Sequence, residues 1–140
     1  MISTSVDCLI DTNVLVYAFA KKGASEPRRD QARALLASAN FGTSGQILQE
    51  FFVVVTRKAG VLMPVDQASR YVERLSRLPC VPVDAHLVLS AIAISRRFKI
   101  SYWDAAVIAA AEELGTLTVY TEDLNHGQKY GTVTVINPFK

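Results

Sequence analysis

Short β-rich runs alternate with longer stretches of helical periodicity along this chain, and that alternation constrains the fold more than any other feature. It is typical of a parallel sheet whose strands are joined by helices packed on both faces. We therefore expect one domain over residues 1–140, of the α/β class, with three α/β/α layers and a mainly parallel central sheet. Strands are predicted at 6–10, 41–44, 81–83, 117–120 and 133–136, and helices at 14–20, 27–39, 46–58, 64–78, 85–98 and 101–114, with a loop over 121–131 and helix ends at Gly60 and Gly115.

The composition narrows the class of protein. Half of the 140 residues are hydrophobic and 20% are charged, which is enough for a buried core. The net charge of +2 permits a nucleic-acid partner without requiring one. Cys8 and Cys80 lie in or beside apolar strands, so we expect two core thiols and a cytoplasmic location. Neither a signal peptide nor an apolar run of about 20 residues occurs, so no membrane association is expected.

Four acidic residues stand where predicted elements begin, end or turn, and their neighbours are apolar. We call them the acidic quartet: Asp11, Glu50, Asp104 and Asp123. Two of them follow predicted strands, and the carboxyl ends of parallel strands meet at one edge of a sheet, where ligands bind. Crowded carboxylates raise one another's pKa unless a cation neutralises them. Oxygen ligands without zinc-type cysteine or histidine spacing favour Mg²⁺ or Mn²⁺, and water bound to such an ion can hydrolyse a phosphodiester.

Several of these residues also have purely structural explanations. Asp104 lies three residues after Ser101 and fits a capping box equally well. Glu50, taken alone, is explained as a solvated helix residue, although its apolar neighbours make uncompensated burial costly. Thr12 or Asn13 is either the N-cap of the following helix or a side chain that orients metal ligands.

Other candidate contacts are weaker. Tyr102 and Trp103 are expected to pack at a helix entry, with base stacking as the alternative. His126 is expected to bond to backbone, Glu122 to point away from its neighbour in the quartet, and Asp7 to lie a strand length away from it. Two groups of basic residues fit either phosphate contacts or solvated helix faces; they are Lys21, Lys22, Arg28, Arg29 and Arg33, and Arg96, Arg97 and Lys99.

Four segments carry a recognisable combination of motifs: DTNVLVYA at 11–18, QILQEFF at 46–52, YWDAA at 102–106 and TEDLNHG at 121–127. Together they resemble the PIN domain, and most closely the VapC-like toxins, over nearly the whole chain. The resemblance implies a Rossmann-like fold and a Mg²⁺- or Mn²⁺-dependent endoribonuclease of a toxin-antitoxin system. By position, it makes the acidic quartet the catalytic and metal-binding residues, with Asn13 and Thr121 as polar supports.

The resemblance also implies partners. They are an RNA substrate, a cognate antitoxin and a second copy of the chain in a homodimer, and the helix near 27–39 is a candidate wall of the antitoxin groove. A PIN-domain RNA processing or decay nuclease, or a non-catalytic PIN-like RNA-binding module, is the alternative. Three other α/β classes fit less well. A haloacid dehalogenase phosphatase needs an aspartate at the position of Asn13, a receiver domain needs a lysine after a strand, and a dinucleotide-binding domain needs a glycine-rich first turn.

Overall fold

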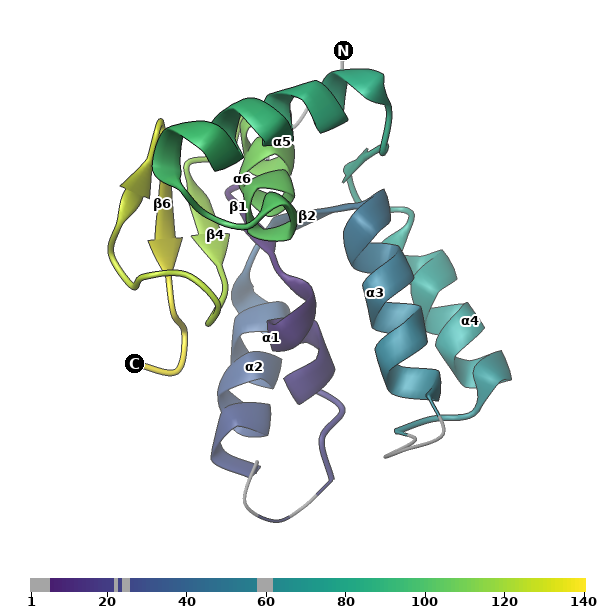
Figure 1. The fold of residues 1–140 in the computed structure, drawn as a ribbon. Coiled ribbons are helices and arrows are strands. Elements are labelled where there is room, and N and C mark those ends of the chain that lie inside the picture. The colour runs from purple at the N-terminus through teal and green to yellow at the C-terminus, as the bar shows by residue number, and fades with distance from the viewer. Residues whose placement is uncertain (1–5, 22, 24–25, 58–61) are drawn as a thin grey trace.

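A six-stranded sheet forms the centre of the computed structural model, which describes residues 6–21, 23, 26–57 and 62–140. The strands run in the order β3-β2-β1-β4-β6-β5, and each neighbouring pair is parallel except β5 with β6. Their bounds are β1 Cys8–Ile10, β2 Phe41–Ser44, β3 Cys80–Val81, β4 Thr118–Tyr120, β5 Lys129–Tyr130 and β6 Val133–Ile136 (Figure 1).

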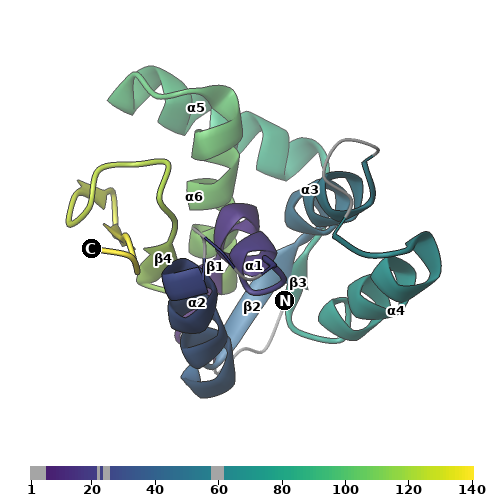
Figure 2. The ribbon, with the colours of Figure 1, turned by 90° about the horizontal axis from the view of Figure 1, so that it is seen from below.

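Helices cover both faces of the sheet. The connections through α1–α2 and α3–α4 step outward from β1 to β2 and β3, whereas α5–α6 leads back to β4 on the other side of β1. Right-handed crossovers therefore place α5 and α6 on the face opposite the other helices, and Figure 2 shows α6 and α2 on opposite sides of the strands. The helices are α1 Thr12–Tyr17, α2 Glu26–Ser38, α3 Gly45–Thr56, α4 Val65–Leu75, α5 Ala85–Phe98 and α6 Tyr102–Leu114.

The alanine-rich helix α6 lies closest to the sheet. Its residues 105–111 are all buried, and it contacts β1, β2 and β4 while α5 packs over it. The approach to β2 is tight at Gly42, where an added Cβ would come within 2.8 Å of Leu114 Cδ1 and 2.9 Å of the Pro79 carbonyl oxygen. Small side chains on both elements thus let the helix approach the strands.

The predicted fold class is confirmed, and most elements lie where they were expected. The bounds of β2, α5 and β6 agree with the prediction, and Gly115 ends α6 in a left-handed conformation. The helix predicted at 14–20 covers 12–17 instead, the one predicted at 64–78 ends at 75, and the strand predicted at 81–83 covers 80–81. The predicted 121–131 loop was wrong in one respect, because β5 lies within it. Gly60 and Lys58 fall outside the described residues.

Two further findings concern the whole chain. Cys8 is buried and Cys80 half-buried, and both are free thiols, as expected. In the part of the chain that the structure describes, none of the helices has the length and apolar character that a membrane crossing requires.

Candidate active site

Asp11 occupies the turn between β1 and α1. Its backbone N–H donates to the Tyr120 carbonyl at 3.0 Å, which fixes it beside the end of β4. Its carboxylate accepts a hydrogen bond from the Thr12 N–H at 2.7 Å and so caps α1. Of the two alternatives for Thr12 and Asn13, the N-cap role is therefore excluded, because Asp11 fills it. The strand-to-helix turn leaves a carboxylate that is 6% exposed at the carboxyl edge of the sheet.

A hydrogen-bond network joins Asp11 to the end of β4. The Asn13 side-chain amide donates to Asp123 at 2.9 Å, to Thr121 Oγ1 at 3.1 Å and, at 3.5 Å, to Asp11. The Thr121 hydroxyl donates to Asp11 at 2.9 Å and accepts from the Asp123 N–H at 3.2 Å. Asn13 and Thr121 thus hold two acids of the quartet, more than 100 residues apart in the sequence, in one orientation.

Glu50 enters the site from the second turn of α3. Its carboxylate accepts a hydrogen bond from the Gln46 amide at 2.8 Å, and the same amide reaches the Trp103 carbonyl at 3.4 Å. Gln46 is buried, so it links α3 to the start of α6 behind the acid. The motif analysis did not identify Gln46, although its position one helical turn before Glu50 is the signal that points to it.

Asp104 lies in the first turn of α6, at the position that the capping-box interpretation expected. Ser101 is the N-cap, and its hydroxyl accepts from the Asp104 N–H at 3.1 Å. Partial burial and the negative charge of Asp123 raise the pKa of the Asp104 carboxyl, against the opposing effect of a hydrogen bond with Ser101. The capped N-terminus of α6 therefore places Asp104 close enough to Asp123 for the two charges to interact.

Burial dominates the electrostatics of Asp11. Loss of solvation raises the pKa of its carboxyl from 3.8 to about 7, against the lowering effect of hydrogen bonds from Thr121 and Thr12. The charges of Asp123 and Glu50 raise it further. Three acids of the quartet thus interact at the tip of β1, and Asp104 joins them through Asp123.

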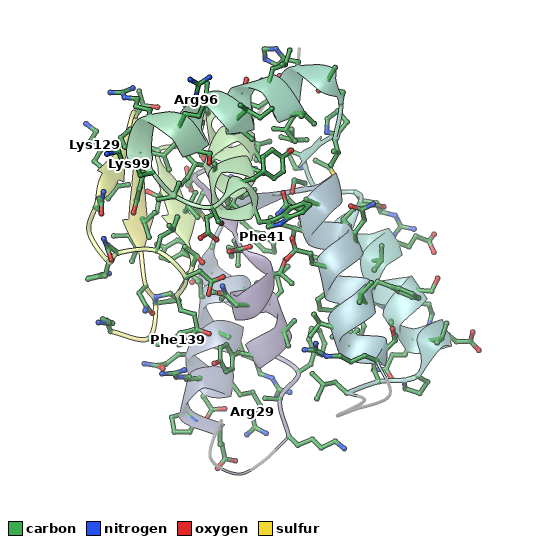
Figure 3. The ribbon with its side chains drawn as sticks, viewed as in Figure 1. Arg29, Phe41, Arg96, Lys99, Lys129 and Phe139 are labelled. Carbon is green, nitrogen blue, oxygen red and sulfur yellow. The ribbon has the colours of Figure 1, made fainter. Side chains whose placement is uncertain are left out.

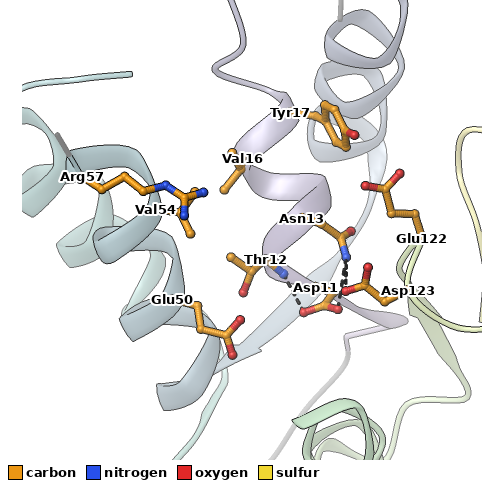
Figure 4. Close-up of a pocket in the computed structure, with 10 residues that line it drawn as sticks. All are labelled: Asp11, Thr12, Asn13, Val16, Tyr17, Glu50, Val54, Arg57, Glu122 and Asp123. Carbon is orange, nitrogen blue, oxygen red and sulfur yellow. Dashed lines mark hydrogen bonds between the residues drawn. The ribbon is translucent and has the colours of Figure 1, made fainter. Parts of the chain in front are cut away.

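A cleft of about 310 Å³ opens above Asp11, Glu50 and Asp123, and Asp104 is not among the residues that line it (Figure 4). Its lining residues are Asp11, Thr12, Asn13, Val16, Tyr17, Glu50, Val54, Arg57, Glu122 and Asp123. Acids occupy one end and the rim, valines from α1 and α3 form the middle, and Arg57 reaches in from the far end of α3.

Glu122 is tied to the rim of this cleft. Its carboxylate accepts from Arg28 of α2 at 3.2 Å, and the same guanidinium donates to the Tyr17 hydroxyl at 3.0 Å. Arg28 also lies over the rings of Tyr17 and Phe139, at 5.5 and 5.4 Å from their centroids. Glu122 therefore anchors the loop after β4 to α2, a role that sequence reasoning did not identify.

Two of the other candidate side chains were predicted correctly and one was not. His126 accepts a hydrogen bond from the Asn137 N–H at 2.9 Å, as expected for a loop histidine bonded to backbone. Tyr102 packs against the core, as expected for a residue at a helix entry. The packing expected of Trp103 was wrong, because 66% of this residue is exposed.

The basic residues of α2 are engaged within the protein. Besides Arg28, Arg29 pairs with Glu26 at 2.9 Å, and Arg33 donates to the Ala18 carbonyl at 2.7 Å. Lys22 lies outside the described residues. Of the second basic group, Arg96 and Lys99 project outward from the end of α5 (Figure 3).

The donor set of the site fits a hard divalent cation. All four acids carry oxygen donors, and two buried polar atoms, Thr12 Oγ1 and Asn13 Oδ1, have no hydrogen-bond partner within the described ranges. The raised pKa of Asp11 also marks a carboxylate that a cation would stabilise in its charged form. Among the described residues, however, no three acidic, cysteine or histidine side chains form a ready-made metal cage. A cation with few protein ligands and several waters, as is usual for Mg²⁺, suits such a site.

Comparisons with known proteins agree with this geometry. Three solved structures resemble the chain over most of its length. The Mycobacterium tuberculosis VapC20 toxin, described as cleaving the sarcin-ricin loop, has 23% identity and a TM-score of 0.64, and the match covers 84% of this chain and 90% of that one. A Klebsiella pneumoniae toxin-antitoxin complex has 17% identity, a TM-score of 0.69 and coverages of 94% and 98%. Neisseria gonorrhoeae FitAcB has 21% identity, a TM-score of 0.61 and coverages of 94% and 98%.

At these identities the structures establish the fold, and the resemblance to VapC-like toxins is confirmed at that level. Comparison with curated protein sequences found no significant match. The model of one family, described as the PIN domain, matches residues 8–131, which include all four acids, both polar supports and the whole of the cleft lining. The chain belongs to the PIN domain family.

Proposed function

We propose that this protein is a divalent-metal-dependent endoribonuclease and the toxin of a toxin-antitoxin pair. Asp11, Glu50, Asp104 and Asp123 are its catalytic and metal-binding residues, and Mg²⁺ is the expected ion, with Mn²⁺ as a substitute. When bound, the ion supplies an acidified water and binds an oxygen of the scissile phosphate. The VapC20 structure, described as a toxin that cleaves an RNA loop, supports the reaction class.

One observation carries the proposal. A carboxylate that is 6% exposed, with a pKa raised to about 7, stands at a strand tip beside two further acids of the same cleft. Among the described residues, none of the four acids forms an ion pair with a lysine or arginine, so the hydrogen bonds to Asp11 are not joined by a cationic side chain. A bound cation compensates this buried charge.

The chain's own residues prepare the reaction. Asn13 and Thr121 fix the carboxylates of Asp11 and Asp123, so that the ligands do not have to reorient when substrate binds. The Gln46 amide fixes Glu50 in the same way. The side chains that line the cleft offer no serine or cysteine nucleophile, which agrees with attack by water.

The test is cleavage of total cellular RNA by the purified protein with Mg²⁺, with Mn²⁺ or with EDTA, beside the variants Asp11→Asn and Asp104→Asn. We expect discrete fragments that require both the ion and the two acids, with activity reduced by at least about a thousandfold in each variant. Equal cleavage by Asp11→Asn and wild type would refute the assignment of the site. Binding of RNA without cleavage would favour a non-catalytic module.

The toxin part of the proposal requires an antitoxin. The Klebsiella pneumoniae structure is described as a toxin-antitoxin complex, which supports a small protein partner for this chain. The proposed wall of the docking groove is α2. Its Arg28 donates to the hydroxyl of Tyr17, a residue of α1 that lines the cleft. Purification of the tagged protein from its native host should recover one small protein in constant proportion, and release of that protein should increase RNA cleavage. Recovery of the chain alone, at full activity, would contradict the pairing.

A further inference from the structure

We infer that Arg57 binds the RNA phosphate next to the scissile one, so that the cleft holds one nucleotide between the catalytic acids and this guanidinium. The inference rests on the proposed function and adds a substrate-positioning residue to it. Arg57 follows the last turn of α3 and lines the same cleft as Asp11, Glu50 and Asp123. Figure 4 shows its side chain extending into the cleft beside Val54.

The geometry of α3 aligns this arginine with the site. Gln46, Glu50 and Arg57 are spaced by four and seven residues, which brings all three to one face of the helix. Seven residues of helix separate Glu50 from Arg57 by about 10 Å along the axis. With Val54 between them, the two side chains lie toward different ends of the cleft, a separation that suits contact with neighbouring phosphates of a strand.

The lining between the two ends is apolar. Val16 of α1 and Val54 of α3 lie between the acids and the guanidinium. Such a surface suits the ribose and base of a nucleotide, because apolar atoms of the ligand displace water there without leaving polar groups unpaired. Anionic groups then bind at both ends of the cleft, one through the cation held by the acids and one through Arg57.

Arg57 differs from Arg28, the arginine bonded to the rim of the cleft, in whether its hydrogen-bond donors are already used. Arg28 is occupied by Glu122 and the Tyr17 hydroxyl. Arg57 is exposed and makes no ion pair or hydrogen bond with the residues that the structure describes, so its donors are available to a ligand. A guanidinium with unpaired donors that faces a cleft is well suited to a phosphate, which accepts two parallel hydrogen bonds from it.

The experiment measures RNA binding separately from cleavage. In an Asp104→Asn background, which prevents hydrolysis, Arg57→Gln, Arg57→Lys and Arg77→Gln are compared with the parent. The probe is a short fluorescein-labelled oligouridylate, and its anisotropy is followed in Mg²⁺ at several salt concentrations. Arg77 provides a matched control, because it carries the same charge, is 72% exposed in a surface pair with Glu73 and lies outside the cleft.

We expect Arg57→Gln to weaken binding about five- to tenfold and to reduce the slope of log K against log salt by about 0.7, the value for one phosphate contact on a single strand. Arg57→Lys should retain part of the affinity, because it keeps the charge without the planar fork. In the otherwise wild-type chain, Arg57→Gln should raise KM and leave kcat nearly unchanged. Circular dichroism should show an unchanged fold.

Three results would overturn the inference. Equal affinity and salt slope for Arg57→Gln and Arg77→Gln would show that Arg57 makes no phosphate contact. A change in Mg²⁺ affinity without a change in RNA affinity would assign Arg57 to charge balance of the acids instead. If the parent binds no oligouridylate and the wild-type protein cleaves no cellular RNA, the proposed function itself fails, whereas binding that is insensitive to Arg57 removes only this inference.

Discussion

At the scale of single residues, Asp11 combines two demands that usually conflict. Its carboxylate caps α1 by accepting from the Thr12 N–H, yet it is almost fully buried beside two other acids. Burial and the neighbouring charges favour its protonated form, whereas the hydrogen bonds from Thr121 and Thr12 favour the charged form. The balance leaves a group that changes charge close to neutral pH.

The stability of the metal-free protein should therefore depend on pH through Asp11. The native state keeps the Asp11 proton up to about pH 7, whereas the unfolded chain releases it near 3.8. The native state thus binds more protons in this window, and the free energy of unfolding should fall as pH rises through it. Urea unfolding in EDTA at about pH 5 and about pH 8 measures this slope.

Asp11→Asn should flatten that slope. Asparagine still accepts a hydrogen bond at the cap but carries no charge, so at about pH 8 the variant should be more stable than wild type by on the order of 1–2 kcal/mol. Mg²⁺ should stabilise the wild type at this pH and leave the variant nearly unaffected. A wild type whose metal-free stability rises steadily from pH 4 to pH 7 would contradict the raised pKa of Asp11.

Two buried threonines make a matched pair for the hydrogen-bond network. Thr121 donates to Asp11, whereas the hydroxyl of Thr43, also buried, has no hydrogen-bond partner among the residues that the structure describes. Thr121→Val should cost about 1–3 kcal/mol of stability above pH 7 and lower kcat by about tenfold or more, because a charged acid loses its donor. Thr43→Val should be neutral or stabilising by up to about 1 kcal/mol. Equal effects in thermal unfolding would contradict the distinction.

At the scale of elements, the helix ends show how local sequence sets the framework. Both α5 and α6 end in a left-handed residue, which is Lys99 with φ of 56° in α5 and Gly115 with φ of 75° in α6. A side chain in this conformation costs about 1–2 kcal/mol, and glycine avoids that cost. The α5 end is therefore strained where the α6 end is not.

Reciprocal substitutions at these ends should shift stability in opposite directions. Lys99→Gly should raise the free energy of unfolding by about 0.5–1 kcal/mol. Gly115→Ala should lower it by about 1 kcal/mol, because alanine is strained in the left-handed conformation. The loss should be no larger, because no neighbouring atom would clash with the new methyl group. Lys99→Ala serves as a control for loss of the charge and should give no gain. Denaturant melts of the three variants decide the matter, and a gain from Lys99→Ala equal to that from Lys99→Gly would point to charge instead.

Sequence patterns predicted the elements that have a strong period of their own. The bounds of α5 follow from regular apolar spacing and those of β2 and β6 from short β-rich runs, and all three agree with the structure. The β5 strand was missed because its two residues have no period and pair only with the following strand, across a turn at Gly131.

The candidate site was predictable to the extent that topology decides it. Parallel strands bring Asp11 and Asp123 to one edge, so their proximity follows from the order of elements alone. The contacts of other side chains in and around the cleft depend on how α2 and α3 pack, which a motif does not encode. Gln46, Arg57 and the pair of Arg28 with Glu122 belong to this second class, although Gln46 and Glu122 lie within two of the motif segments.

At the scale of the whole molecule, the outer face of α5 carries exposed apolar side chains on which a second copy of the chain could pack. Leu89 is 67% exposed and Ile92 43% exposed, and their spacing of three residues puts them on one face of the helix. Burial of two such side chains against a partner removes apolar surface from water, which is the main driving force of association. The homodimer expected from the sequence is therefore predicted to form through α5.

Light scattering at micromolar concentration should give the mass of two chains for the wild type. Leu89→Glu should give the mass of one, because a charge placed in an apolar interface remains without a partner. Leu117→Glu is the control, since Leu117 is 65% exposed but precedes β4 rather than lying on α5. A monomeric wild type, or equal dissociation by both variants, would contradict an interface on α5.

Asp11 is both the cap of α1 and a buried acid of the site, and this affects how the protein could lose its activity by mutation. Under the proposed function, a substitution to asparagine keeps the helix cap, relieves repulsion among the buried acids and removes catalytic activity. This substitution does not reduce the stability of the fold. A cell that carries the mutation therefore keeps a well-folded, inactive protein rather than one that is degraded. The inactive protein would still bind the partners of the active one and would compete with it for them.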